Sequence, residues 1–138
     1  MRGEGSSDRS SVPEDVAGYV DRLGERLDPD AVVLFGSRAG AHAHLQSDYD
    51  LLVIAEDLPA DFWQRQDLLW EGKPHSVDVL GFTPEEVRGG IYRGLILDAL
   101  LQGTSLYGDP AEFRRLAEEH LRTRGLVRTS AGYVRKPA

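Results

Sequence analysis

Three aspartates are the residues of this chain whose type and spacing most clearly suggest chemistry. Asp48 and Asp50 stand two residues apart where an apolar segment begins, and Asp78 interrupts a later apolar segment. Carboxylates held so close repel each other unless a cation lies between them, and Mg²⁺ prefers carboxylate, phosphate and water oxygens. We therefore predict a metal site in which the three carboxylates hold two ions about 3.5–4 Å apart, the separation used for in-line displacement at phosphorus.

A glycine–serine pair supplies the second half of the predicted site. Gly36 and Ser37 directly follow an apolar segment, and Arg38 comes next. Glycine lets the backbone approach a phosphate, and a serine hydroxyl and N–H near a helix start favour an anion. Gly36 and Ser37 are therefore predicted to hold a phosphate chain, while Arg38 is either a further phosphate contact or a solvated arginine.

Each of these motifs is weak by itself, because an Asp-x-Asp at the start of a strand is usually a turn or a cap. Their joint occurrence on suitable elements carries the prediction. The chain contains neither a Walker A loop nor a dinucleotide-binding fingerprint, so a phosphate site would be of another kind.

Apolar segments around these residues predict the strands that must position them. Residues 31–35 and 49–56 are expected to be strands on either side of the site loop, and residues 76–80 a third strand with Asp78 between two valines. Alternation along a strand would put Asp48 and Asp50 on one face. The predicted fold class is α/β (α+β), with a short mixed sheet flanked by helices and the metal site at one sheet edge.

Two helices are expected before the third strand. The first begins with a capping box at 11–14 and stops at the Asp-Pro-Asp segment of residues 28–30. The second lies within residues 58–71, before a Gly-Lys-Pro break. Phe62 and Leu69 are predicted to face inward, and Trp63 and Trp70 are assigned, with Phe62, to the core or an interface rather than to a base-stacking shelf.

Two more helices are expected after the third strand. One begins with a capping box at Thr83 and runs to about Gln102, although two glycines weaken its first half. Another has the same start signature at 109–112 and runs to about residue 124. A short edge strand at 105–107 and a terminal hairpin complete the predicted elements.

Composition excludes several classes of protein. The 138 residues contain no cysteine, which excludes disulfides, zinc–thiolate sites and a cysteine nucleophile. A formal charge of −7 argues against general nucleic-acid binding, which needs a basic face. No apolar run approaches the roughly 18 residues that span a bilayer, and the polar first residues are unlike a secretory signal. We therefore expect a cytoplasmic protein with no membrane partner.

Other polar residues are weighed against simpler interpretations. Four histidines could be ligands but are better explained as surface or loop residues: His42, His44, His75 and His120. Four cationic residues could reach a triphosphate but are more often simply exposed: Arg65, Lys73, Arg88 and Arg93. The basic C-terminal segment could meet nucleic acid or a partner, but a solvated face is favoured.

The combination of Gly36-Ser37, Asp48-x-Asp50 and Asp78 resembles the nucleotidyltransferase superfamily of the DNA polymerase beta type. The forms GSRA…SDYDLLV and LLQGTSLYG are similar to the minimal nucleotidyltransferases, and the resemblance covers about residues 31–108. It implies a polymerase beta palm-like fold. One departure is Gly40, where close relatives often have a second arginine, and this puts a phosphate or acceptor contact in doubt.

The resemblance implies a role for each motif residue. Gly36 and Ser37 would hold the phosphates of a nucleotide. Asp48 and Asp50 would bind both Mg²⁺ ions. Asp78 would bind the catalytic metal and accept the proton of the attacking hydroxyl. The implied reaction moves a nucleoside monophosphate, most simply AMP from ATP, to a hydroxyl and releases pyrophosphate.

The resemblance also implies a partner, because many minimal nucleotidyltransferases are antitoxins that adenylylate a tyrosine of a HEPN-type toxin. Two alternatives stay open: transfer to a small molecule such as an aminoglycoside, and a non-catalytic antitoxin that only binds its partner. The expected organisation is a flexible arm at 1–12, a nucleotidyltransferase domain at 13–108 and a C-terminal extension at 109–138. The acceptor, the base preference and self-association into a homo-oligomer are left open.

Overall fold

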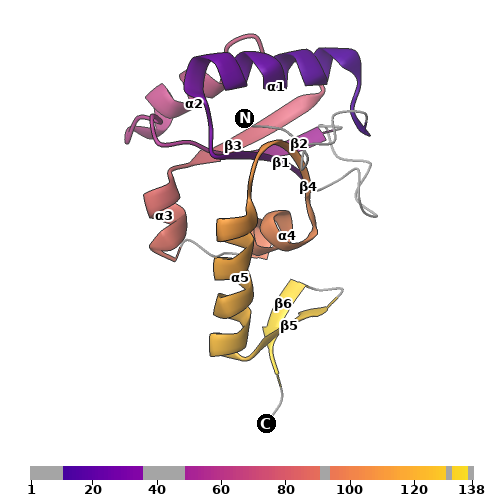
Figure 1. The fold of residues 1–138 in the computed structure, drawn as a ribbon, viewed down its shortest axis with the longest axis vertical. Coiled ribbons are helices and arrows are strands. Elements are labelled where there is room, and N and C mark those ends of the chain that lie inside the picture. The colour runs from indigo at the N-terminus through magenta and orange to yellow at the C-terminus, as the bar shows by residue number, and fades with distance from the viewer. Residues whose placement is uncertain (1–10, 36–48, 91–93, 130–131, 137–138) are drawn as a thin grey trace.

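The computed structural model describes residues 11–35, 49–90, 94–129 and 132–136 (Figure 1). Helices and strands are interspersed along the chain, as expected for a mixed α/β (α+β) fold. In chain order they are α1 (Glu14–Leu27), β1 (Ala31–Phe35), β2 (Tyr49–Ile54), α2 (Phe62–Trp70), β3 (Val77–Phe82), α3 (Pro84–Arg88), α4 (Gly94–Gln102), β4 (Thr104–Gly108), α5 (Ala111–Arg124), β5 (Leu126–Thr129) and β6 (Gly132–Arg135).

Four strands form one sheet in the order β3-β2-β1-β4, and β5 and β6 form a separate hairpin. β1 is antiparallel to both of its neighbours, β2 and β4, whereas β2 and β3 are parallel. The mixed sheet, the edge strand β4 and the terminal hairpin were all predicted from the sequence, and the structure confirms them.

The sheet has a hydrophobic core on each face, because nearly all of its central residues are apolar and alternate between the two sides. Val32, Leu51 and Val79 pack in the cluster that contains the buried residues of α1 and Leu69 of α2. The other cluster joins the alternate strand residues to Leu97 and other buried residues of α4, and to Phe113 of α5. Figure 1 shows α1 and α2 on one side of the sheet and α3, α4 and α5 on the other.

The helix predicted after the third strand is broken, and this prediction was wrong. α3 ends at Arg88, and the described part of α4 begins at Gly94. Gly89 is the C-terminal cap of α3, and Gly90 has a φ of 98°, in the left-handed region that ends helices. Two adjacent glycines therefore end the helix rather than merely weaken it.

The capping box at the start of α3 is confirmed. The Thr83 hydroxyl accepts a hydrogen bond from the Glu86 N–H at 3.1 Å, and the Glu86 carboxylate accepts one from the Thr83 N–H at 2.9 Å. α1 and α5 do not start with the boxes predicted for them, because their N-cap residues are Pro13 and Pro110, neither of which makes a side-chain cap bond.

Local chemistry explains both missing boxes. Val12 precedes a proline, which disfavours a helical conformation at that residue, so α1 cannot begin at Ser11. At α5 the Glu112 carboxylate pairs with Arg88 instead of turning back to the helix start. Asp109 still assists this helix start, because its carboxylate accepts a hydrogen bond from the Ala111 N–H at 2.9 Å.

Replacing Thr83 with alanine should lower the free energy of unfolding by about 1 kcal/mol, the usual cost of losing an N-cap hydroxyl. The substitution leaves the Glu86 N–H without its side-chain partner. Urea denaturation followed by circular dichroism measures the change. Glu85→Gln, at an exposed position of the same turn, is the matched control and should change stability by less than about 0.5 kcal/mol.

The aromatic side chains of α2 do not face inward, so that part of the prediction was also wrong. Only Leu69 is buried, whereas Phe62, Trp63 and Trp70 are 58%, 69% and 46% exposed. Asp61 caps the helix by accepting a hydrogen bond from the Gln64 N–H. This starting point turns positions 65 and 69 towards the sheet, and the polar residues Arg65 and Gln66 are buried in α2 together with Leu69.

The C-terminal segment packs on the second core. Phe113 and Ala117 of α5 are buried in the cluster that contains α4. The β5–β6 hairpin is tied to α4 because Arg128 Nε donates to Asp98 Oδ1 at 3.0 Å. No helix in the described part of the chain combines the length and the apolar character needed to cross a membrane.

Candidate functional site

Asp50 and Asp78 lie side by side on adjacent strands. They are register partners in the parallel pair of β2 and β3. Neighbouring strands are about 4.8 Å apart, and partners in register point to the same face of a sheet. Two carboxylates thus leave the sheet from adjacent positions, at the end where β2 and β3 both begin.

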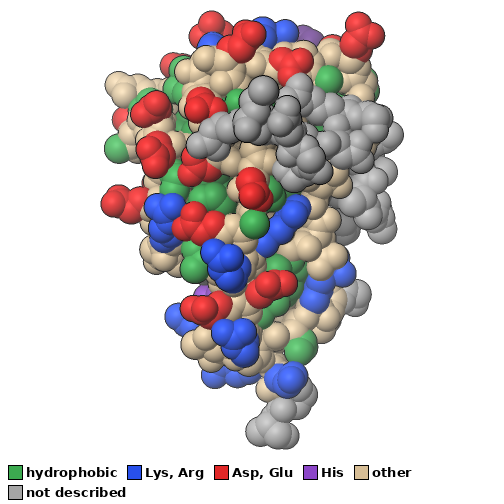
Figure 2. Space-filling view, in the orientation of Figure 1, with side chains coloured by type: hydrophobic (Ala, Val, Ile, Leu, Met, Phe, Trp, Pro, Cys, Tyr) green, Lys and Arg blue, Asp and Glu red, His purple; other side chains and the backbone are tan. Residues whose placement is uncertain are grey.

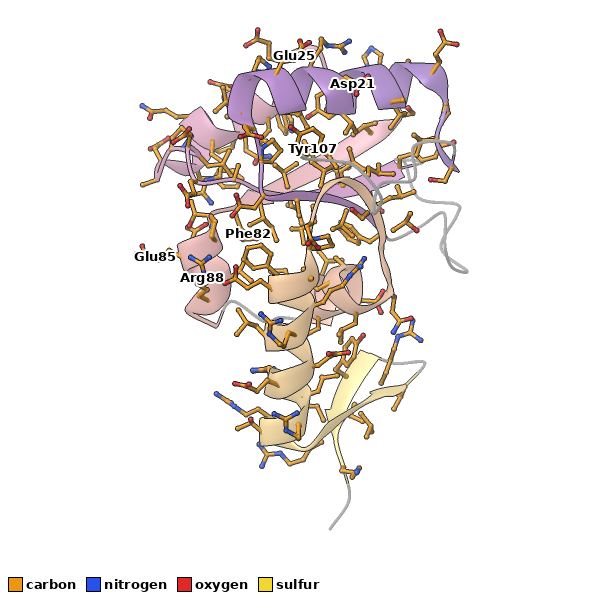
Figure 3. The ribbon with its side chains drawn as sticks, in the orientation of Figure 1. Asp21, Glu25, Phe82, Glu85, Arg88 and Tyr107 are labelled. Atoms are coloured by element: carbon orange, nitrogen blue, oxygen red, sulfur yellow. The ribbon has the colours of Figure 1, made fainter. Side chains whose placement is uncertain are left out.

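The burial patterns of β2 and β3 show that Asp50 and Asp78 lie at the margin of the hydrophobic core. Asp50 has the same parity along β2 as Leu52 and Ile54, so it belongs to the face that carries α4 and α5. Further along β3, Phe82 lies on this same face (Figure 3). Asp50 is nevertheless half-buried and Asp78 exposed, because the core covers the later residues of both strands and not their beginnings.

The last residue of β1 lies at the same end of the sheet, where β2 and β3 begin. This residue, Phe35, is the register partner of Asp50 in the antiparallel pair of β1 and β2. Three neighbouring strands therefore bring Phe35, Asp50 and Asp78 into one row. The predicted site residues Gly36, Ser37, Arg38 and Asp48 lie outside the described residues. Gly36 follows Phe35 directly in the chain, and Asp48 immediately precedes β2.

The described part of the site has the donor atoms that a hard divalent cation needs. One oxygen of Asp78 accepts a hydrogen bond from the Val79 N–H at 3.1 Å, and no described Lys or Arg forms an ion pair with this carboxylate. Two adjacent carboxylates suit Mg²⁺, which takes oxygen ligands and keeps several waters. No group of three metal-ligating side chains occurs among the described residues, of which Asp48 is not one.

A family model described as a nucleotidyltransferase domain matches residues 16–103. The chain belongs to this family. The match includes all six predicted site residues, from Gly36 to Asp78, and it confirms the resemblance stated from the motifs. Comparison with curated proteins gives no match.

Two solved structures are similar to this nucleotidyltransferase. A "toxin-antitoxin with AMP-PNP" is 20% identical, with a TM-score of 0.54, over 78% of this chain and 87% of that chain. The "toxin-antitoxin MntA-HepT" is 17% identical, with a TM-score of 0.53, over 79% of this chain and 86% of that chain. At these identities the likeness establishes the fold, and the nucleotidyltransferase architecture that was predicted is confirmed.

Three cationic residues considered as phosphate contacts have structural partners in this nucleotidyltransferase. Arg65 pairs with Glu86, with an Nη1–Oε1 distance of 2.8 Å. Arg88 pairs with Glu112, with an Nε–Oε2 distance of 2.7 Å. Lys73 Nζ donates to the carbonyl oxygens of Pro74 and Val77. These contacts favour structural roles for the three cations.

Of the five remaining candidate ligands and phosphate contacts, three lie outside the described residues and two lie within them. His42, His44 and Arg93 lie outside the described residues. His75 is exposed, and His120 on α5 is half-buried, where burial lowers its pKa below the ordinary value. Sequence reasoning missed that Arg65 is buried, and the nearest signal for it was the glutamate of the predicted capping box, whose carboxylate it binds.

Proposed function

We propose that this nucleotidyltransferase is Mg²⁺-dependent and transfers AMP from ATP to a hydroxyl acceptor. The observation that carries the proposal is the register pairing of Asp50 and Asp78, on adjacent strands, at the edge where β1 leads into Gly36-Ser37. Phosphoryl chemistry needs mainly positioning and electrostatic stabilisation, and this edge of the sheet offers both.

The proposed roles follow from the chemistry of each side chain. Asp48, Asp50 and Asp78 would hold the two metal ions. The ions, when bound, supply charge stabilisation to the attacking and leaving oxygens. The backbone at Gly36 and the hydroxyl of Ser37 would bind the phosphate chain, with Arg38 as a further cationic contact.

Atoms and protons balance in the proposed transfer. The acceptor oxygen forms a bond to the α-phosphorus of ATP, and the bond from that phosphorus to the pyrophosphate oxygen breaks. Asp78 would receive the proton of the hydroxyl. In-line displacement places the acceptor and pyrophosphate on opposite sides of the phosphorus.

The proposed acceptor is a tyrosine of a HEPN-type partner protein. Two similar solved structures are toxin–antitoxin complexes, one of them with AMP-PNP. They support a protein partner and an adenine nucleotide.

The test combines the purified chain, ATP, Mg²⁺ and the product of a neighbouring gene as the candidate HEPN-type partner. Intact-mass spectrometry should find the partner heavier by one adenylate, with the modification on a tyrosine. A partner that binds tightly but stays unmodified would replace the proposal with a binding-only antitoxin. Modification of an aminoglycoside with no protein target would replace it with a small-molecule transferase.

Removing divalent cations should stop the transfer. With excess EDTA, the adenylylated fraction of the partner should fall to background, and adding Mg²⁺ beyond the chelator should restore it. The physical reason is that Asp48, Asp50 and Asp78 repel one another and the triphosphate when no cation neutralises them. Transfer that persists in EDTA at an undiminished rate would contradict the metal site.

A further inference from the structure

Helix α2 has a second apolar face that points away from the sheet. Positions 63, 67 and 70 share one side of a helix, so Trp63, Asp67 and Trp70 form an outward stripe. Phe62 extends the stripe, because its ring meets that of Trp63 edge-on with centroids 5.0 Å apart. We call Phe62, Trp63, Asp67 and Trp70 the α2 aromatic face.

Acidic side chains flank this face in the sequence. Asp57 and Asp61 are exposed before it, and Asp67 lies between the two tryptophans. Glu71, just after α2, is exposed and pairs with Arg26 of α1 at an Nη1–Oε1 distance of 3.7 Å. The arginine of α2 adds no free positive charge here, because Arg65 is buried and paired with Glu86. The α2 aromatic face therefore combines large apolar side chains with a negative border.

Charge is also unevenly distributed along the chain as a whole, and the basic residues are concentrated towards its C-terminus. Residues 111–138 contain seven of the 16 Lys and Arg residues but only three of the 23 Asp and Glu residues. Figure 2 shows acidic side chains crowding the upper part of the molecule, where α1 and α2 lie, and Lys and Arg gathered around α5. Asp21 and Glu25 on α1 belong to this acidic part (Figure 3).

The negative border favours one class of binding partner over the others that exposed tryptophans can contact. Nucleic acids and anionic membranes both carry negative charge, and binding to either depends on Lys and Arg near the contact. A protein surface with Arg or Lys around an apolar centre has the complementary charge. Tryptophans are common in the centres of such interfaces, where a few residues supply most of the binding energy.

We propose that the α2 aromatic face is the docking surface for the HEPN-type partner, and that the partner meets it with arginine or lysine around an apolar centre. The inference rests on the proposed function for the identity of the occupant. Trp63 and Trp70 supply the apolar anchors, and each ring can also accept a cation over its face. Asp67, between them, pairs with a guanidinium or ammonium group of the partner.

The test measures the affinity of the purified chain for the same neighbouring gene product, the candidate HEPN-type partner, by isothermal titration calorimetry. The double variant Trp63→Ser/Trp70→Ser should raise the Kd at least 30-fold, and Asp67→Lys about 10-fold. Matched controls are Leu95→Ser, an equally exposed apolar residue on α4, and Glu118→Lys, an exposed acid on α5. Both controls should keep the wild-type Kd, and thermal melts show whether each variant is folded.

Three results would overturn the inference. They are an unchanged Kd for the tryptophan and Asp67 variants, no binding of the HEPN-type protein by the wild-type chain, and self-association of the chain that the double variant abolishes. The third result would assign the face to a second copy. Asp50→Asn separates this inference from the proposed function, since that variant should bind with the wild-type Kd while transferring no adenylate.

Discussion

Replacing Asp50 with asparagine is expected to lower the rate of nucleotidyl transfer by at least about 10³-fold while the protein stays folded. Asp50 is the middle member of the row that Phe35, Asp50 and Asp78 form across three strands. Asparagine keeps the shape of the side chain but removes the charge that would face the metal ions. The initial rate of adenylate incorporation at saturating ATP and Mg²⁺ measures the effect.

Two companion variants make this result specific. Asp78→Asn should reduce the rate to a similar extent, because its carboxylate projects from the adjacent register position. Glu118→Gln, at an exposed position of α5, should leave the rate unchanged. If Asp50→Asn kept the wild-type rate, and circular dichroism showed that all three variants were folded, Asp50 would be excluded from the site.

The sheet and the row of site residues could largely be predicted because their signals are local. Residues 31–35 carry no polar side chain, so a buried strand was the simplest interpretation. The aspartate between two valines was predicted to be a site residue on a third strand, and Asp78 lies at an exposed position of β3. The register that pairs Asp78 with Asp50 is a long-range property, and the sequence predicted only that the strands share a sheet.

The errors occurred where the outcome depended on tertiary contacts. Apolar character left the tryptophans of α2 to the core or an interface, and the helix start at Asp61 turned them outward. Arg65 was taken for a surface residue, because arginine is rarely buried without a partner. Its partner, Glu86, comes from another helix, and no local pattern shows that contact.

Replacing Arg65 with methionine is expected to lower the free energy of unfolding by about 3 kcal/mol. The buried guanidinium donates to the carbonyl oxygens of Pro59 at 2.8 Å and Gly81 at 3.0 Å, as well as to Glu86. Methionine fills much of the space but leaves both carbonyls without this donor. Urea denaturation measures the loss, and Arg22→Met, at an exposed arginine of α1, should cost less than about 0.5 kcal/mol.

The pH dependence of stability separates the ion pair from the packing of Arg65. The hydrogen bond from Arg65 lowers the pKa of Glu86 below its ordinary value of 4.5. A lowered folded-state pKa contributes stability above pH 4.5, and this contribution is lost as the pH falls through the folded-state value. Wild type should therefore exceed Glu86→Gln in stability at neutral pH, and the difference should shrink in acid. A difference that stays constant from neutral to acid pH would mean that the charge of Glu86 adds nothing, and that Arg65 acts through its bonds to Pro59 and Gly81.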